Sequence, residues 1–289
     1  MNDFLLSILL GVVEGLTEFL PVSSTAHLRI VEALLRLDLH DSFWKMYTIV
    51  IQLGAILALP VYFWRRILEF LATFPKGERG DRNFITHPLG LTFIAFVVTA
   101  GPAWALTKVI GKNLESLSVM ATALLVGGIV MWIVDAMFTR PRVTHMEEMN
   151  LPQAVWIGAC QILSAVFPGT SRSMSTIAAG QIVGMSRPAA LEFSFFLSMP
   201  TMVVATLYDL YKTLAHNRNT AMEGNLAPLA VDTHQWIVIA IGFVVSFIVA
   251  LGVVAWFMRW VRARGFAPFA IYRIVLAIVL FVLIMRGLI

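Results

Sequence analysis

Apolar residues run through this chain in long blocks separated by short polar stretches. Six blocks reach the roughly 20 residues that an α-helix needs to cross about 30 Å of hydrocarbon. They lie at residues 44–63, 88–109, 117–138, 187–211, 235–258 and 267–286. The pattern therefore predicts an all-α polytopic membrane protein with about six transmembrane helices.

Two further apolar blocks are interrupted near their middle. Residues 3–37 are broken at Pro21 and residues 151–183 at Pro168 and Gly169, and hydroxyl side chains follow each break. A broken helix leaves backbone groups unpaired, and hydrocarbon cannot satisfy them, so such a segment must be buried in protein or line a wet cavity. We expect both blocks to form re-entrant hairpins.

The two interrupted blocks are also alike in sequence. A shift of 147 residues lays Pro21 over Pro168 and Ser24 over Ser171. Three predicted spans separate the copies, an odd number, so we expect an inverted-topology repeat whose hairpins face each other. Such repeats place a binding site near the membrane midplane, between broken helices. The prediction is a single integral membrane domain over residues 1–289, with repeat halves at about 1–140 and 141–289.

Composition and charge agree with this class. Of the 289 residues, 59% are hydrophobic and 13% charged, and the mean hydropathy is +0.83. Soluble domains have more charged residues and a lower mean hydropathy. The formal net charge is +4, but the basic residues sit at span ends, where they set orientation, so we expect no nucleic-acid partner. They cluster after the first, third and fifth spans, which predicts cytoplasmic ends there: Arg65, Arg66, Lys76, Arg79, Arg82, Arg140, Arg142, Arg259, Arg262 and Arg264.

Two carboxylates precede the first break. Glu14 and Glu18 are four residues apart, so on a helix their Cβ atoms share one face about 5–6 Å apart. Carboxylates at membrane depth repel each other and are costly to desolvate unless a cation or an arginine lies between them. We therefore predict a functional pair that holds a metal ion, rather than two solvated acids.

Three consecutive hydroxyls, Ser23, Ser24 and Thr25, follow Pro21, and His27 comes three residues after Ser24. One hydroxyl is enough to cap a helix, so the others are free for a ligand. A histidine one turn from a serine resembles a nucleophile with its base.

The second break has the features of an anion site. Gly169 frees the backbone to turn, the following amides begin a helix, and Arg172 offers a planar fork of donors that suits phosphate. Hydroxyls at Ser171, Ser173 and Thr176 add further donors. With a paired-carboxylate site and a serine near a histidine, these parts meet the needs of phosphoryl transfer. A lipid phosphate or diphosphate would reach a site inside the bilayer.

At these residues the chain resembles the bacterial undecaprenyl-diphosphate phosphatases, the bacitracin-resistance family. "EGLTEFLPVSSTAH" at 14–27 resembles that family's glutamate-rich motif with its Ser-Ser-Thr-x-His, and "PGTSRSMST" at 168–176 resembles its P-G-x-S-R-S-x-x-T signature. The similarity runs along the chain through "IQLGAILA" at 51–58, "EFSFFLSMP" at 192–200, "YDLYK" at 208–212 and "PFAIYR" at 268–273. One departure is Ala26, where the family pattern has glycine.

The resemblance implies hydrolysis of undecaprenyl diphosphate, a C₅₅ lipid, to the monophosphate in the bacterial inner membrane, which recycles the carrier for peptidoglycan. It implies a divalent cation, Mg²⁺ or Ca²⁺, and is compatible with a homodimer. By motif position, Glu14 and Glu18 take the metal and acid/base role, Ser24 is the candidate nucleophile and His27 its partner. The residues expected to bind the substrate are Ser23, Thr25, Gly169, Ser171, Arg172, Ser173 and Thr176.

A secondary transporter or a flippase for a polyprenyl phosphate is the alternative function. Facing broken helices from inverted repeats are typical of transporters. Adjacent nucleophile candidates favour chemistry, while a phosphatase that also moves its lipid product is compatible with both patterns.

Overall fold

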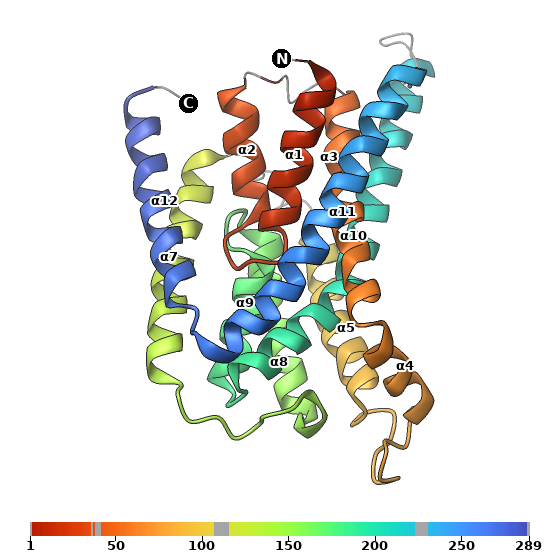
Figure 1. Cartoon of the computed structure of the whole chain (residues 1–289), viewed down its shortest axis with the longest axis vertical. Helices are drawn as coiled ribbons and strands as arrows, with labels where there is room; N and C mark the ends of the chain where they lie inside the picture. Colours follow the sequence, from red (N-terminus) through yellow and green to blue (C-terminus); the bar gives the residue numbers. More distant parts are fainter. Residues whose placement is uncertain (1, 36, 38–41, 107–115, 223–230, 288–289) are drawn as a thin grey trace.

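The computed structural model describes residues 2–35, 37, 42–106, 116–222 and 231–287. Within these ranges the chain forms eleven α-helices and one 3₁₀ helix, and no β-strand (Figure 1). The elements are α1 (Asp3–Thr17), α2 (Ser24–Leu34), α3 (Ser42–Tyr62), α4 (Trp64–Thr73), α5 (Pro88–Ala105), α7 (Leu117–Met137), η1 (Met146–Glu148), α8 (Leu151–Val166), α9 (Arg172–Ile182), α10 (Arg187–Met222), α11 (Thr233–Ala263) and α12 (Ala267–Met285).

Six helices are long and apolar enough to cross a membrane, as predicted. They are α3, α5, α7, α10, α11 and α12, with mean hydropathies between 1.5 and 3.0 over their most apolar stretches. The predicted bounds differ from the observed ones by a few residues, and the end of the predicted span 88–109 lies outside the described residues. The prediction of an all-α polytopic membrane protein is confirmed.

The two interrupted blocks form two pairs of short helices. The first helices of the pairs, α1 and α8, have 15 and 16 residues, or roughly 24 Å at 1.5 Å per residue, which is too short to span. Each pair starts and finishes at the same end of the molecule, and the two connecting turns face each other near mid-height (Figure 1). This is the arrangement expected of facing hairpins, and their re-entry with respect to a bilayer stays a prediction.

The shift of 147 residues extends beyond the two breaks. It lays α1, α2, α3, α5 and α7 over α8, α9, α10, α11 and α12, with every helix start within three residues of its counterpart. The two sets interleave: α1 packs against α11, α8 packs against α5, and the counterparts α7 and α12 pack against each other. Residues from both sets therefore share the same buried core.

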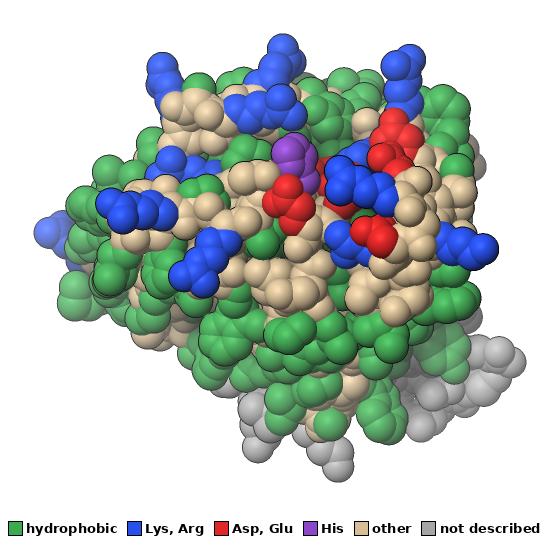
Figure 2. Space-filling model, turned by 90° about the horizontal axis from the view of Figure 1, so that it is seen from below, with side chains coloured by type: hydrophobic (Ala, Val, Ile, Leu, Met, Phe, Trp, Pro, Cys, Tyr) green, Lys and Arg blue, Asp and Glu red, His purple; other side chains and the backbone are tan. Residues whose placement is uncertain are grey.

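Basic side chains gather at the lower end of the molecule. The segments between α3 and α5, between α7 and α8, and between α11 and α12 all lie there (Figure 1). Seen from below, this face carries Lys and Arg side chains with a smaller group of acids (Figure 2). All three segments that the arginine pattern predicts to be cytoplasmic thus share one end, which makes that pattern self-consistent.

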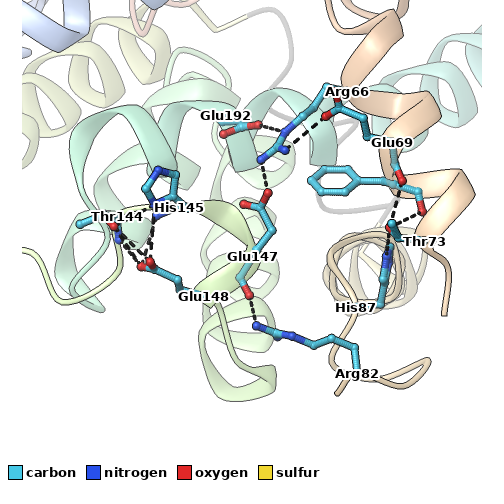
Figure 3. Close-up of polar contacts among 11 residues, drawn as sticks. Arg66, Glu69, Thr73, Arg82, His87, Thr144, His145, Glu147, Glu148 and Glu192 are labelled. Carbon is cyan, nitrogen blue, oxygen red and sulfur yellow. Dashed lines mark hydrogen bonds and ion pairs between the residues drawn. The ribbon is translucent and has the colours of Figure 1, made fainter. Parts of the chain in front are cut away.

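Ion pairs and hydrogen bonds connect several elements at the lower end of the molecule (Figure 3). Arg66 of α4 pairs with Glu192 of α10 at 2.9 Å and with Glu147 of η1, and Arg82 donates to the backbone carbonyl of Glu147. Beside them, the amide of Thr144 donates to Glu148 at 2.6 Å and lowers the pKa of that carboxyl. The network ties α4, η1 and α10 together.

A second polar cluster at this end lies around a buried carboxylate, Asp135 of α7. It accepts hydrogen bonds from Arg187 Nε at 2.6 Å, from the Phe266 amide at 2.9 Å and from Gln181 Nε2 at 3.3 Å. One side chain thus joins α7 to α9, to α10 and to the start of α12.

Candidate active site

The first turn buries its two carboxylates. Glu14 is fully buried on α1, and Glu18, at the C-terminal cap of that helix, is 7% exposed. Among the described residues, neither carboxylate oxygen of Glu14 has a hydrogen-bond partner. Since buried charges without partners are very costly, this position calls for a proton or a bound cation.

The Ser24 hydroxyl lies against a carboxylate. Its Oγ donates to Glu18 Oε2 at 2.5 Å. Ser23, not Ser24, caps α2: it has a φ of 73°, and its side chain accepts from the Ala26 amide at 3.4 Å. Ser24 is therefore free of any capping role and is paired with a potential base.

Among the described residues, His27 has no hydrogen bond to Ser24, which differs from the predicted pairing of these two residues. Its Nδ1 lies 2.7 Å from the Ser23 carbonyl oxygen, and its Nε2 lies 2.7 Å from the hydroxyl of Tyr272 on α12. A carbonyl only accepts, so Nδ1 carries a proton, and Nε2 accepts from the Tyr272 hydroxyl when the ring is neutral. Both ring nitrogens are occupied, and Glu18 takes the place beside Ser24 that the spacing gives to His27.

The second turn presents free donors. Ser171 has a φ of 69°, and its side chain caps the Met174 amide at 3.4 Å. In the part of the chain that the structure describes, the backbone amides of residues 171–173 have no acceptor. Three unpaired amides at a helix N-terminus are suited to an anion, and the anion site itself stays a prediction.

Arg172 and Ser173 connect the second turn to the first. Arg172 Nη2 lies 3.4 Å from Glu18 Oε1, and Ser173 Oγ donates to the Leu20 carbonyl at 3.0 Å. The Arg172 side chain is 12% exposed, and its Nη1 has no partner. The guanidinium therefore points between the two turns rather than snorkelling to the surface, with donor capacity left for an anion.

The remaining residues predicted to bind the substrate are Thr176, Gly169 and Thr25, and they lie in different surroundings. Thr176 Oγ1 bonds to the Arg172 carbonyl at 3.0 Å and to Ser194 Oγ at 2.6 Å, so its hydroxyl is used within the helix packing. Gly169 has a φ of 94°, and a Cβ there would lie 2.6 Å from the Met120 carbonyl oxygen. Thr25 is exposed beside the turn.

Two residues of α12 at this junction were missed: Tyr272, which bonds to His27, and Arg273, which is fully buried. A charged side chain in the middle of an apolar helix is a signal of function in membrane proteins. That signal was present in the sequence, at the seventh residue of α12.

The carboxylates fit a divalent cation. Both Glu14 oxygens lack a hydrogen-bond partner in the part of the chain that the structure describes, and Glu18 lies one turn away. In the described ranges no group of three His, Cys, Asp or Glu side chains converges. Two carboxylates are nevertheless what Mg²⁺ commonly takes from a protein when substrate phosphates and water complete its shell. The donor set thus suits a cation shared with a phosphate ligand.

The first prediction concerns Arg172→Lys, which keeps the charge but loses the planar fork. We expect purified Arg172→Lys protein to bind methylenediphosphonate about 10- to 100-fold more weakly than the unmodified protein, since a hydrogen bond to a charged group contributes about 1.5–3 kcal/mol. Isothermal titration in detergent measures this. Arg187→Lys is the matched control, because Arg187 pairs with Asp135 at the lower end of the bundle. Equal affinity for Arg172→Lys and the unmodified protein would contradict the anion site.

Comparison with known proteins adds independent evidence. The family described as "Bacitracin resistance protein BacA" matches residues 7–279. The chain is 67% identical over 279 residues to an undecaprenyl-diphosphatase of Koribacter versatilis, covering 96% of this chain and 97% of that protein. It is 38% identical to an undecaprenyl-diphosphatase of Caldanaerobacter subterraneus over 98% of this chain and 97% of that protein. It is 41% identical to undecaprenyl-diphosphatase 2 of Paramagnetospirillum magneticum over 96% of this chain and 98% of that protein. With a match this long and relatives this similar, the chain belongs to the BacA family of bacitracin resistance proteins.

Proposed function

We propose that the chain is an undecaprenyl-diphosphatase of the bacterial inner membrane. It hydrolyses undecaprenyl diphosphate to undecaprenyl phosphate and inorganic phosphate, which recycles the carrier lipid for peptidoglycan and other envelope polymers, and so confers the bacitracin resistance in the family's name. The observation that carries this proposal is the contact between the two turns, where Arg172 reaches Glu18 beside Ser24.

The free amides of residues 171–173 and the guanidinium of Arg172 receive the diphosphate. They supply fixed donors to its oxygens, and such donors stabilise the charge that develops in phosphoryl transfer. Because Arg172 also contacts Glu18, a phosphate held by Arg172 lies close to the Ser24 hydroxyl.

Ser24 attacks the terminal phosphorus. Its Oγ forms the new bond to phosphorus, the hydroxyl proton passes to Glu18, and the bridging oxygen leaves with undecaprenyl phosphate. Water then attacks the phosphoserine and releases inorganic phosphate, and the proton held by Glu18 returns to Ser24. The short hydrogen bond from Ser24 to Glu18 supports this assignment of nucleophile and base.

Glu14 and Glu18 are the residues that would hold a divalent cation, Mg²⁺ or Ca²⁺. When bound, it neutralises charge on the diphosphate oxygens. The unpartnered oxygens of Glu14 support this role.

A flippase or transporter is the second candidate, favoured by the interleaved helix pairs that face each other (Figure 1). Release of inorganic phosphate from C₅₅ diphosphate by purified protein in detergent separates the two functions. We expect release that stops with a chelator and resumes when Mg²⁺ or Ca²⁺ is restored. Movement of lipid across proteoliposomes without any phosphate release would instead support the transporter.

Glu14→Gln is expected to weaken activity most at low divalent cation, because the amide is a poorer ligand than a carboxylate. The measurement is the rate of phosphate release against cation concentration, and we expect the half-saturating concentration to rise about tenfold or more, with excess cation restoring part of the rate. Glu32→Gln is the control, since Glu32 is also buried but pairs with Arg29 at 3.4 Å. A defect in Glu14→Gln that is independent of the cation would point to proton transfer instead.

Ser24→Ala is expected to abolish turnover while methylenediphosphonate still binds, since Arg172 and the amides of α9 are unchanged. Stability should stay close to that of the unmodified protein, because Ser23 provides the cap of α2. Rapid quenching with substrate labelled in its terminal phosphorus should place label on Ser24. Robust turnover by Ser24→Ala without any labelled protein would refute the serine nucleophile in favour of direct attack by water.

A further inference from the structure

Arg273 of α12 is a fully buried arginine that bonds to both turns. Its Nη1 donates to the Pro21 carbonyl in the first turn at 3.1 Å. Its Nη2 lies 3.1 Å from the Gly169 carbonyl oxygen and 3.0 Å from that of Thr170 in the second turn, and 3.1 Å from that of Ala123 on α7. One planar side chain thus spans the junction of the two broken helices.

This guanidinium is paired with backbone carbonyls alone. Within the described ranges none of the ion pairs includes Arg273, and its Nε has no hydrogen-bond partner, although the side chain is 0% exposed. A buried charge without a counter-ion costs several kcal/mol, and charged residues inside membrane bundles usually mark function. Gly127 of α7 leaves room for this guanidinium, since a Cβ at that residue would lie 2.3 Å from Arg273 Nη2.

The carbonyls held by Arg273 determine where the amides point. A trans peptide is planar, so a carbonyl aimed at Arg273 turns the amide of the following residue the opposite way. For the carbonyl of Thr170 that residue is Ser171, whose amide is one of the three without an acceptor. The amide that follows Gly169 is instead bonded to the Phe167 carbonyl at 3.1 Å. Arg273 therefore orients a free donor of the anion site from behind.

We propose that Arg273 is a positioning residue for the phosphate chemistry of this site. It fixes the first turn relative to the second, so that Ser24, Arg172 and the free amides can contact the same phosphate group. Its positive charge lies next to the peptides that bind the anion. This inference rests on the proposed function, because it assigns the residue to the diphosphate site.

The main test displaces the guanidinium without removing it. Gly127→Ala places a methyl group against Arg273 Nη2 and against the flexible end of Met174, while the matched control Gly252→Ala, on α11, meets nothing within 4 Å. We expect Gly127→Ala to lower kcat for C₅₅ diphosphate by about tenfold or more, because small misplacements at a reacting centre can cost about 10² in rate. It should also weaken methylenediphosphonate binding, while the thermal unfolding temperature matches that of Gly252→Ala.

Substitutions of Arg273 itself provide the second test. Arg273→Lys keeps the charge with fewer donors and Arg273→Met removes both, so we expect kcat and probe affinity to fall in the order Arg, Lys, Met. Arg187→Met is the control for a lost arginine contact elsewhere: it should lower the unfolding temperature yet leave kcat and probe affinity per folded protein unchanged.

Unchanged kcat and probe affinity in Gly127→Ala would overturn the proposal, and so would equal losses in Arg187→Met and Arg273→Lys. If the Arg273 variants do not fold, Gly127→Ala against Gly252→Ala decides alone. Absence of phosphate release by the unmodified protein would instead contradict the proposed function, and probe binding would still compare the variants.

Discussion

Two helices break and meet inside an apolar bundle, and every backbone group that the breaks expose must find a partner there. The carbonyls and the amides of the two turns differ in this respect. Carbonyls of both turns accept from Arg273, and Leu20 accepts from Ser173. The amides of residues 171–173 are left open. A site that satisfies its acceptors and leaves its donors free is suited to an anion.

The charges at this junction constrain which anion can bind. Glu14 and Glu18 both lie near Arg172, and Arg273 donates to the Pro21 carbonyl of the first turn. Two potential negative charges thus stand against two positive ones, so the charges of these four side chains nearly cancel. A diphosphate adds further negative charge to a region of low dielectric, where such an excess is very costly. A divalent cation held by Glu14 would restore the balance, and this supports the proposal that the acids and the phosphate-binding groups act together.

The sequence predicted most of the fold, because spanning helices and breaks depend on local features: apolar length, proline and glycine. It also singled out Glu14, Glu18, Ser24 and Arg172, which lie together in the structure, since charge and hydroxyl clusters inside apolar blocks are rare.

The contact made by His27 could not be predicted in the same way. Ser24 is the first residue of α2, and its hydroxyl turns back to Glu18, whereas the ring of His27 bonds to Tyr272, 245 residues away in the chain. Spacing along a helix shows which contacts are within reach, and tertiary packing decides which of them form.

The repeat explains why the molecule has one composite site rather than two equivalent ones. Under the shift of 147 residues, Gln161 and Ala165 stand where Glu14 and Glu18 stand, and Arg172 stands where Thr25 stands. The buried amide of Gln161 donates to Thr99 at 3.2 Å and to Thr201 at 3.1 Å, as a structural group. The first copy therefore carries the two carboxylates and the second carries the arginine.

Arg273 has no charged counterpart either. Its equivalent on α7 is Val126, next to Gly127, which leaves room for the guanidinium. Since α7 and α12 are themselves counterparts packed against each other, a second arginine at that position would place two like charges near the same contact. The two copies share a backbone arrangement but differ in their side chains, and this difference places opposite charges opposite each other in one site. Two identical turns would carry the same charges and could not form such a site.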